Sequence, residues 1–593
     1  MFRLNPLLFL RPYLHVDITI NTHSYAKFAK RGIKSLDHFP HVLDGKASKR
    51  KDASENCILW ESSSISQNRI KELEAKDGLH WPRIETHPRT YSIQNFRHKW
   101  EVLLPGKDAN KDESVCVRGK MMACRIMGTR LIFMDLIQDG KTLQVMANLR
   151  TLSESSGVSE ESFQTFYHLA QRGDYISVTG HAHRTLRGEL SIYADSLPKI
   201  ISPTLRSLPK TILDRALRMR NRHVDLIINR NLQQTIRMRS HVVQYLRDFL
   251  LRNGFLEVQT PIIADKATGA IARPFLTNSA YISDKIMALR VAPELWLKRL
   301  IIGGFDRVFE LGPAFRNEGF DHSHNPEFTT CEFYKAFANL EQLIGITETI
   351  FSGLATSAIH LQKFSLGDLP EIDSSVLKAP FRRVEFIPAI EEALKEKLPN
   401  LESSTAQEEV SDLLLKNNNS LPESPTLPRL LDKLSSLYIE PWCTMPTLIM
   451  YPPACMAPLA KSFLDPKSNQ IVSARAELYV QCHELANMYE EENSPIEQRK
   501  KFEEQKKYKD LENECNVDES YLSALEWGLP PTGGWGCGVD RLVMLLTGAR
   551  RIQDVLSFGG LKNVVSLGSA SENKSLRTDK EEKNASVNSN QRE

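Results

Sequence analysis

The sequence predicts an α+β protein with several domains, in which a small N-terminal β-barrel precedes a larger domain built on an antiparallel sheet flanked by helices. Short β-rich runs separated by turn residues fill residues 112–202, and one long amphipathic helix followed by recurring strands occupies residues 229–567. The 593-residue length is several times that of a typical domain. Hydrophobic residues make up 41% of the chain, which supplies apolar side chains for more than one core.

The first of these domains is predicted from five strands and a helix. The strands are expected at Val115–Val117, Leu131–Leu136, Thr142–Ala147, Tyr175–Gly180 and Leu190–Tyr193. Asp139-Gly140 between the second and third strands is a strong hairpin signal, and a helix at Glu160–Gln171 follows the third strand. Five strands with a helix after the third match an OB-fold, which often binds single-stranded nucleic acid. An unrelated small barrel is the alternative.

The larger domain is predicted to begin with a helix at Asn229–Arg252 and a strand that Pro261 ends. Further strands are expected at Leu289–Ala292, Val308–Phe315 and Glu327–Phe337, a hairpin at Glu477–Tyr489, and a helix at Cys537–Leu546. Residues 391–427 are rich in Ser, Asn, Glu and Pro, which predicts a loosely folded insertion.

The ends of the chain differ in composition from the two domains. The first 36 residues contain six Lys and Arg but one acid, Asp17, which is typical of an organellar transit peptide, although a basic tail is the alternative. Residues 37–111 are expected to form an extension with a helix at Ser66–Lys76, and residues 568–593 a disordered tail. The basic connector 203–228 could bind a phosphate backbone, or its charges could form a solvated helix face.

Composition excludes two other classes. Nine cysteines without metal-ligand spacing argue against a zinc site and against a secreted disulfide scaffold. No apolar run approaches the roughly 20 residues of a membrane helix, so no membrane insertion is expected.

Two strand-like runs around residues 307–337 flank a polar loop that carries Arg316, Glu318 and His324. A guanidinium on a rigid hairpin suits a phosphate, because its donors match phosphate oxygens. On the second strand, alternation places Phe328 and Glu332 on one face, roughly 13 Å apart at about 3.3 Å per residue. That is about the length of an aminoacyl-adenylate, with an aromatic platform for the base at one end and a carboxylate for the amino acid at the other. The alternative for each residue alone is a salt-bridged surface strand.

The hairpin near residue 480 carries a pair of carboxylates. If Gln481-Cys482 is a two-residue turn, Glu477 and Glu484 share a face about 7–8 Å apart. Such a pair could share Mg²⁺ with triphosphate oxygens, or it could be solvated at a sheet edge. Asn487 reaches the same pocket only if the strand has a bulge or ends there.

A glycine-rich run, Gly533 to Gly538, leads directly into Asp540 and Arg541 at the start of an apolar helix. Glycines allow close approach to a ligand, and Arg541 can lie over a base or bind a terminal phosphate. The run matches neither a dinucleotide-binding loop nor a P-loop.

Three of these segments resemble the motifs of the class II aminoacyl-tRNA synthetases: the helix at Asn229–Arg252 with the strand that Pro261 ends resembles motif one, the hairpin with Phe315–Gly319 motif two, and the glycine-rich run into Arg541 motif three. Stretches such as Thr268–Phe275, Arg290–Leu295 and Glu484–Asn487 resemble the lysyl-tRNA synthetase family, and the ending Asp554–Gly559 resembles its fungal mitochondrial branch. The resemblance implies a class II catalytic domain, a homodimer, and the substrates lysine, ATP and tRNA(Lys) in the mitochondrial matrix. It assigns catalysis to Arg316 and Arg541, and ATP binding to Arg316, Glu318, His324, Phe328, Glu477, Glu484 and Arg541, with Mg²⁺ on Glu477 and Glu484. It assigns lysine binding to Gly269, Glu294, Arg316, Glu332, Tyr334, Asn487, Tyr489 and Glu491, and the anticodon to Phe133 and Gln144.

The sequence departs from the family pattern at three places, and the site residues also bear on two alternative functions. Gln481-Cys482 stands where the family has Asn-Gly, His483 replaces an Arg, and Met146 replaces an aromatic residue near the anticodon Gln. An aspartyl- or asparaginyl-tRNA synthetase would need a cationic donor where this pocket lining is anionic. A non-catalytic, RNA-binding relative would be expected to have lost its ATP residues, which are present here.

Overall fold

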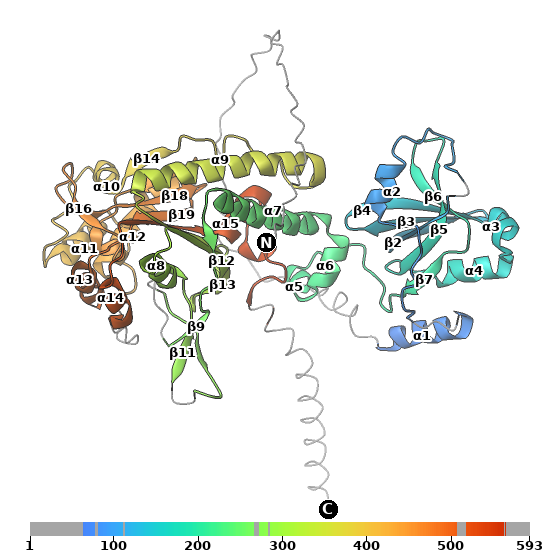
Figure 1. The fold of residues 1–593 in the computed structure, drawn as a ribbon, viewed down its shortest axis with the longest axis horizontal. Coiled ribbons are helices and arrows are strands. Elements are labelled where there is room, and N and C mark those ends of the chain that lie inside the picture. Colours follow the sequence, from blue (N-terminus) through green and yellow to red (C-terminus); the bar gives the residue numbers. More distant parts are fainter. Residues whose placement is uncertain are drawn as a thin grey trace, which may run out of the picture. The chain divides into compact units, whose positions relative to one another are not determined.

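The computed structural model describes residues 63–77, 81–110, 113–265, 272–282, 285–506, 517–561 and 564 (Figure 1). The predicted transit peptide at 1–36, the predicted tail at 568–593 and the predicted lysine contact Gly269 lie outside the described residues. In the part of the chain that is described, every helix is too short or too polar to span a membrane.

The five predicted strands of the N-terminal domain are present. They are β2 (Val115–Met127), β3 (Leu131–Gln138), β4 (Lys141–Asn148), β5 (Tyr175–Arg184) and β6 (Leu190–Ala194). They pair in the order β2-β3-β4-β6-β5, and β5 also pairs with β2. Asp139 and Gly140 both have positive φ, as a type I′ hairpin turn requires. Alternate side chains of the strands point into one buried core.

Two features of this domain differ from the prediction. The predicted helix is α4 (Glu160–Leu169), and it is preceded by an additional helix, α3 (Leu149–Ser156), which Asn148 caps directly after β4. The core also begins before residue 112. The short strand β1 (Thr90–Tyr91) pairs with β2, and α2 (Ile93–Lys99) buries Ile93 and Phe96 in the same core. β7 (Lys199–Ser202) pairs with β5, and α1 (Ser63–Asp77) matches the helix predicted at Ser66–Lys76.

The larger domain is built on an eight-stranded sheet of order β14-β15-β18-β19-β20-β13-β12-β8. Its strands are β8 (Leu256–Glu257), β12 (Arg307–Phe315), β13 (Glu327–Ala336), β14 (Arg382–Glu385), β15 (Thr447–Met450), β18 (Arg475–Val480), β19 (His483–Glu490) and β20 (Thr532–Gly538). All neighbours are antiparallel except β8 with β12 and β14 with β15. β20, the last strand in the sequence, lies between β13 and β19.

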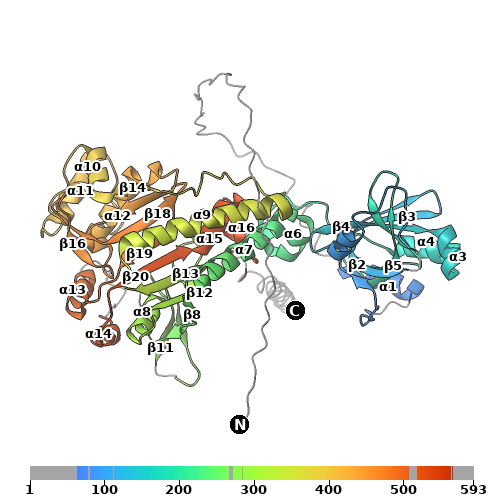
Figure 2. The same ribbon diagram turned by 45° about the horizontal axis from the view of Figure 1, so that its top comes forward.

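Helices cover one face of this sheet, and the other face holds a cavity. α7 (Arg230–Arg252), α9 (Leu340–Ser365) and α15 (Val539–Thr547) lie together over the first face (Figure 2). Along β13, Cys331 and Phe333 point into the core beneath these helices. Tyr334 points the other way, where α8 (Glu294–Ile302) and α14 (Glu519–Leu525) pack. The period of two along β13 therefore separates a core face from a site face.

Two predicted boundaries in this domain are wrong. The strand expected at Leu289–Ala292 is β11 (Ile286–Leu289), and α8 begins at Glu294. β11 pairs with β9 (Ile263–Ala264) and β10 (Leu276–Asn278) in a separate small sheet. The helix expected from Cys537 begins at Val539, because Gly533 to Gly538 continue β20 through its pairing with β13.

The loosely folded insertion predicted at 391–427 is also wrong. α10 (Phe386–Leu394), α11 (Ala406–Lys416) and α12 (Leu427–Tyr438) pack into a core of their own against β15 and β18. The polar composition belongs to the turns between them, while Val410, Leu413 and Leu414 give α11 an apolar face. Near this core lies the hairpin β16 (Ser462–Leu464) and β17 (Ile471–Ser473), and α13 (Pro495–Lys506) follows β19.

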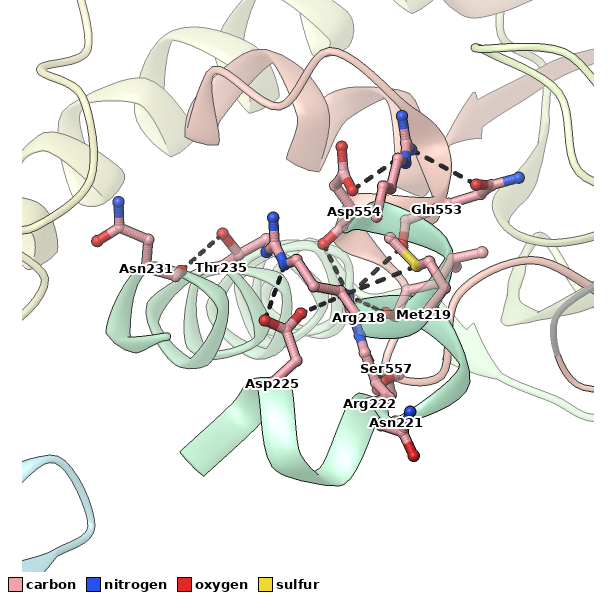
Figure 3. A network of polar contacts seen from close by, with 12 residues as sticks. Arg218, Met219, Asn221, Arg222, Asp225, Asn231, Thr235, Gln553, Asp554 and Ser557 are labelled. Atoms are coloured by element: carbon pink, nitrogen blue, oxygen red, sulfur yellow. Dashed lines mark hydrogen bonds and ion pairs between the residues drawn. The ribbon is translucent and has the colours of Figure 1, made fainter. Parts of the chain in front are cut away.

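The basic connector is partly helical, and three of its arginines, Arg215, Arg218 and Arg222, form ion pairs within the protein. α5 (Arg215–Arg220) and α6 (Arg222–Ile228) carry the network drawn in Figure 3. Arg222 is 2% exposed. Its guanidinium donates to the carbonyl oxygens of Gln553, Asp554, Leu556 and Ser557 at 2.9–3.4 Å, and it also pairs with Asp225. Arg222 is therefore not available to a phosphate backbone; it holds the segment that includes α16 (Ile552–Val555).

Candidate active site

A cavity of about 530 Å³ lies on the site face of β13, β19 and β20. Its lining contains most of the residues predicted for the site: Glu294, Arg316, Glu318, His324, Phe328, Glu332, Tyr334, Glu484, Asn487, Tyr489 and Arg541. Thus side chains from three separate sequence motifs meet around one space. Two predicted residues, Glu477 and Glu491, are absent from the lining and are described below.

Arg316 and Phe328 form one end of the cavity, and they lie where β12 ends and β13 begins. The Arg316 guanidinium carbon is 5.1 Å from the centroid of the Phe328 ring. The Arg316 Nε is buried, and no atom of the described residues accepts a hydrogen bond from it. A buried donor without a partner is costly. An anionic ligand that accepts from Nε would remove that cost.

Arg541 is held beside this end by a chain of polar contacts. Its guanidinium lies 2.8 Å from His324 Nε2 and donates to the main-chain oxygen of Glu484 at 3.0 Å. His324 Nδ1 lies 2.6 Å from Asp321. Burial opposes ionisation of Asp321, but hydrogen bonds from His324 and from main-chain N–H groups lower its pKa to about 2. An ionised Asp321 fixes the tautomer that leaves His324 Nε2 to accept from Arg541.

The β18–β19 hairpin supplies the carboxylates. Gln481 and Cys482 both have positive φ, so the turn adopts the type I′ shape although neither residue favours it. Tyr479 lies opposite Glu484 and Glu477 opposite Asn487, with a register shift between the two pairs. This is the bulge that the sequence required if both Glu484 and Asn487 were to face one side.

Arg475 begins β18 and lies opposite Tyr489 at the open end of the hairpin. Its guanidinium donates to Asn487 Oδ1 at 2.9 Å and forms an ion pair with Glu477. Burial raises the pKa of Glu477 to about 7, with Glu484 adding to the effect and Arg475 opposing it. Arg475 thus orients the Asn487 amide and carries the neutralising charge for Glu477. Sequence reasoning did not single out Arg475, although it shares a strand face with Glu477.

No cluster of three or more His, Cys, Asp or Glu side chains arranged for a metal ion occurs within the described ranges. Two carboxylates nevertheless fit Mg²⁺, which is usually held by one or two carboxylates together with substrate phosphates and waters. Glu477 and Glu484 could provide that donor set when a polyphosphate supplies the remaining oxygens.

The other end of the cavity is anionic. Glu332 accepts from Thr330 Oγ1 at 3.3 Å and from the Tyr334 hydroxyl at 3.5 Å. Burial, and then the charge of Glu294, raise the pKa of Glu332 to about 8, although Arg316 opposes the shift. Glu294 accepts from the Tyr489 hydroxyl at 2.5 Å. This end is suited to a cation, because its carboxylates are buried with few donors.

Glu491 lies just behind this end. Its side chain is fully buried, and Oε2 is in ion-pair contact with Lys298 Nζ. A Cβ on Gly534 would come within 1.9 Å of Glu491 Oε1, so only glycine fits between Glu491 and the cavity. Among the described residues, no hydrogen-bond partner of Glu491 Oε1 is found. Glu491 is therefore not a solvated surface acid.

In the N-terminal domain, Phe133 pairs with Met146 and Asp135 pairs with Gln144 across β3 and β4. All four side chains are half-buried and belong to the alternate set that does not enter the core. Gln144 Oε1 accepts from Ser191 Oγ at 3.0 Å. Phe133 and Gln144 are thus neighbours on one outer face.

The comparisons with known proteins show the family of this chain. Residues 214–562 match the family model of class II tRNA synthetases (D, K and N). The mitochondrial lysine–tRNA ligase of Schizosaccharomyces pombe is 38% identical over 82% of this chain and 91% of its own length. A lysine–tRNA ligase of Cladosporium cladosporioides is 35% identical over 91% of both chains, and one of Nostoc punctiforme is 35% identical over 81% and 85%.

The eight-stranded sheet, the cavity and the family match define a class II tRNA synthetase. Within that class the chain belongs to the lysine–tRNA ligase family, and it is therefore an aminoacyl-tRNA synthetase.

Proposed function

We propose that this cavity activates lysine with ATP to give lysyl-adenylate, and that the protein then transfers lysine to tRNA(Lys) in mitochondria. One observation carries the proposal. A guanidinium with a buried, unpartnered Nε, that of Arg316, stands at one end of the cavity, and the buried carboxylates Glu294 and Glu332 stand at the other. A molecule with a phosphate at one end and an ammonium at the other satisfies both ends.

In the first step, a carboxylate oxygen of lysine forms a bond to the α-phosphorus of ATP, and the bond from that phosphorus to the pyrophosphate oxygen breaks. A carboxylate is ionised at neutral pH, so no protein base is needed. Arg316 stabilises the charge that develops on the α-phosphate. Phe328 and Arg541 enclose the adenine, and Glu318 and His324 orient the nucleotide.

Glu477 and Glu484 would hold Mg²⁺, which on binding neutralises charge on the phosphate oxygens. In the second step, the terminal hydroxyl of the tRNA attacks the carbonyl carbon of the adenylate, and AMP leaves. Positioning rather than proton transfer dominates both steps.

Lysine is recognised by charge at both of its amino groups. Glu294, together with Gly269, receives the α-ammonium group, and Asn487, oriented by Arg475, receives the carboxylate. Glu332, Tyr334, Tyr489 and Glu491 receive the side-chain ammonium. A buried ammonium without such partners would cost several kcal/mol, on the order of the penalty for any unpaired buried ion.

ATP–pyrophosphate exchange with each of the twenty amino acids tests this function. Lysine alone should support exchange at micromolar to millimolar concentration, the usual range of KM. Exchange with aspartate or asparagine instead would assign the chain to that branch of the class. Absence of exchange with every amino acid would indicate a non-catalytic protein.

The N-terminal domain is proposed to be an OB-fold that binds the anticodon through Phe133 and Gln144. The strand order and the pairing of β2 with β5 support the fold. Phe133→Ala should raise the KM for tRNA(Lys) severalfold, since stacking on one base is worth about 1–3 kcal/mol. Lysine-dependent exchange without tRNA should be unchanged. An unaltered KM for tRNA would remove Phe133 from the interface.

A homodimer is proposed through the region around motif one. Apolar side chains of the small sheet are exposed there: Ile263, Leu276 and Ile286 are each at least 50% accessible. Exposed apolar patches of this kind mark interaction surfaces. Sedimentation at micromolar concentration should give twice the 67.4 kDa mass of the chain. A monomer would contradict the proposal.

Mitochondrial delivery is proposed to depend on residues 1–36, which hold one acid among six basic residues. Deleting residues 2–36 should leave aminoacylation intact in vitro and leave the protein in the cytosol. Undiminished delivery of the deletion to mitochondria would contradict this assignment.

A further inference from the structure

A buried lysine lies between two of the carboxylates assigned to the amino-acid end. Lys298, on α8, has no exposed surface. Its ammonium is 2.6 Å from Glu294 Oε1 and is also in ion-pair contact with Glu491 Oε2. The rings of Tyr334, Tyr489 and Tyr521 surround it at 5.7–5.9 Å. Lys298, like Glu491, is not among the residues that line the cavity.

This ammonium is charged in the folded protein. Burial by itself lowers the pKa of Lys298, but the charges of Glu294 and Glu491 outweigh burial and raise it above its ordinary value. A buried cation persists only when it is well paired. Lys298 and the two carboxylates are therefore interdependent: the cation requires both acids, and the cation fixes where both acids stand.

The contacts also settle which oxygen of Glu294 is occupied. Lys298 and the Tyr489 hydroxyl both donate to Oε1. Oε2 is thus the oxygen left to meet a ligand in the cavity. Glu491 comes from the end of the β19 hairpin and Glu294 from the start of α8, so one ammonium joins two elements that are distant in sequence.

We propose that Lys298 is a positioning residue for lysine selection: its buried ammonium holds Glu294 and Glu491 in the geometry that receives the two ammonium groups of the substrate. It also neutralises one of the negative charges at this end of the cavity. The remaining negative charge is then matched by one substrate molecule and not by free cations. This proposal rests on the assignment of the cavity to lysine in the proposed function.

Lys298→Met tests it, because methionine keeps an unbranched apolar chain and removes the charge. Without the cation, Glu294 and Glu491 are left buried and unpaired. The KM for lysine in ATP–pyrophosphate exchange should rise by about tenfold or more, the scale of losing a buried charge partner. The KM for ATP and the kcat at saturating lysine should change by less than about threefold, because the nucleotide end is not touched.

Lys501→Met is the matched control. Lys501 also forms a buried ion pair, at 2.8 Å with Glu492, the neighbour of Glu491. It lies outside the cavity lining, so its removal should leave the KM for lysine within about twofold. If Lys298 has a merely structural role, Lys298→Met and Lys501→Met should change the KM for lysine equally. Alternatively, Lys298→Met should lower kcat and change the KM for ATP as strongly as the KM for lysine. Either outcome overturns the proposal.

Two further variants keep the test decisive. If Lys298→Met does not fold, Lys298→Arg is used. Its charge is retained, but its planar fork cannot hold both acids at an ammonium's distances. The KM for lysine should then rise at least about threefold with the KM for ATP unchanged, and an unaltered KM for lysine overturns the proposal. Glu332→Gln distinguishes a wrong pocket from a wrong role for Lys298. If Glu332→Gln leaves the KM for lysine unchanged, the proposed pocket is wrong. If Glu332→Gln weakens lysine use and Lys298→Met does not, only the role of Lys298 is wrong.

Discussion

Glu491→Gln offers a sharp test of the amino-acid pocket, because the substitution keeps the shape of a fully buried side chain and removes its charge. Glu491 has one charged partner in contact, Lys298, and an oxygen that faces Gly534 at the cavity wall. If the substrate ammonium is its second partner, the variant breaks a buried charge pair in the complex. Such losses cost about 2–5 kcal/mol. Two kcal/mol is about a 30-fold loss in kcat/KM for lysine.

The assay is lysine-dependent ATP–pyrophosphate exchange, with ATP varied in a parallel series. The KM for ATP should barely change, since Glu491 is not among the residues at the nucleotide end. Glu490→Gln is the control: Glu490 accepts a hydrogen bond from the main-chain N–H of Leu340 at 2.9 Å and lies outside the cavity lining. If KM and kcat for lysine both stay within about twofold in Glu491→Gln, Glu491 does not receive the substrate.

Three other predictions concern separate parts of the molecule. Arg316→Ala should slow adenylate formation by at least two orders of magnitude, since a donor at developing charge is worth about 3–4 kcal/mol; near-normal exchange would exclude it from the site. Arg222→Met should lower the free energy of unfolding by about 1–3 kcal/mol or more in denaturant titrations, because buried carbonyl oxygens lose their donor while Asp225 keeps Arg218; a change under about 0.5 kcal/mol would refute this. The raised pKa of Glu332, about 8, means that its carboxyl holds a proton in the empty pocket at lower pH and cannot pair with an ammonium. The kcat/KM for lysine should therefore rise with pH up to about 8 and then level, and Glu332→Gln should lose that dependence.

The predictable part of the structure is the part in which local pattern and tertiary packing agree. Residues 307–337 alternate cleanly, and the structure pairs Arg307–Phe315 with Glu327–Ala336 in the expected hairpin. The hairpin at Gln481-Cys482 was also placed correctly. The bulge needed to bring Glu484 and Asn487 to one side could only be stated as a condition, because the sequence does not show which residue leaves the ladder.

The unpredicted part depends on contacts between distant residues. The polar turns that flank α11 predict a loose segment, yet the apolar face of α11 packs in one core with α10 and α12. Arg222 belonged to a charge run that composition assigned to solvent or phosphate, and its partners are carbonyl oxygens more than three hundred positions away. Lys298 gives no sequence signal for the same reason. Its spacing of four from Glu294 is that of an ordinary ion pair on a helix, and its contact with Glu491 exists only in the folded chain.

The position of β20 in the sheet determines when this domain can fold. β20 is the last strand to be synthesised, yet it lies between β13 and β19, pairing Cys331 with Cys537 and Asn487 with Gly536. Until residues 532–538 leave the ribosome, the sheet exists as two separate halves, each with an open edge at what becomes its centre. Such long-range pairing slows folding. The two halves of the sheet therefore cannot join until residues 532–538 are available.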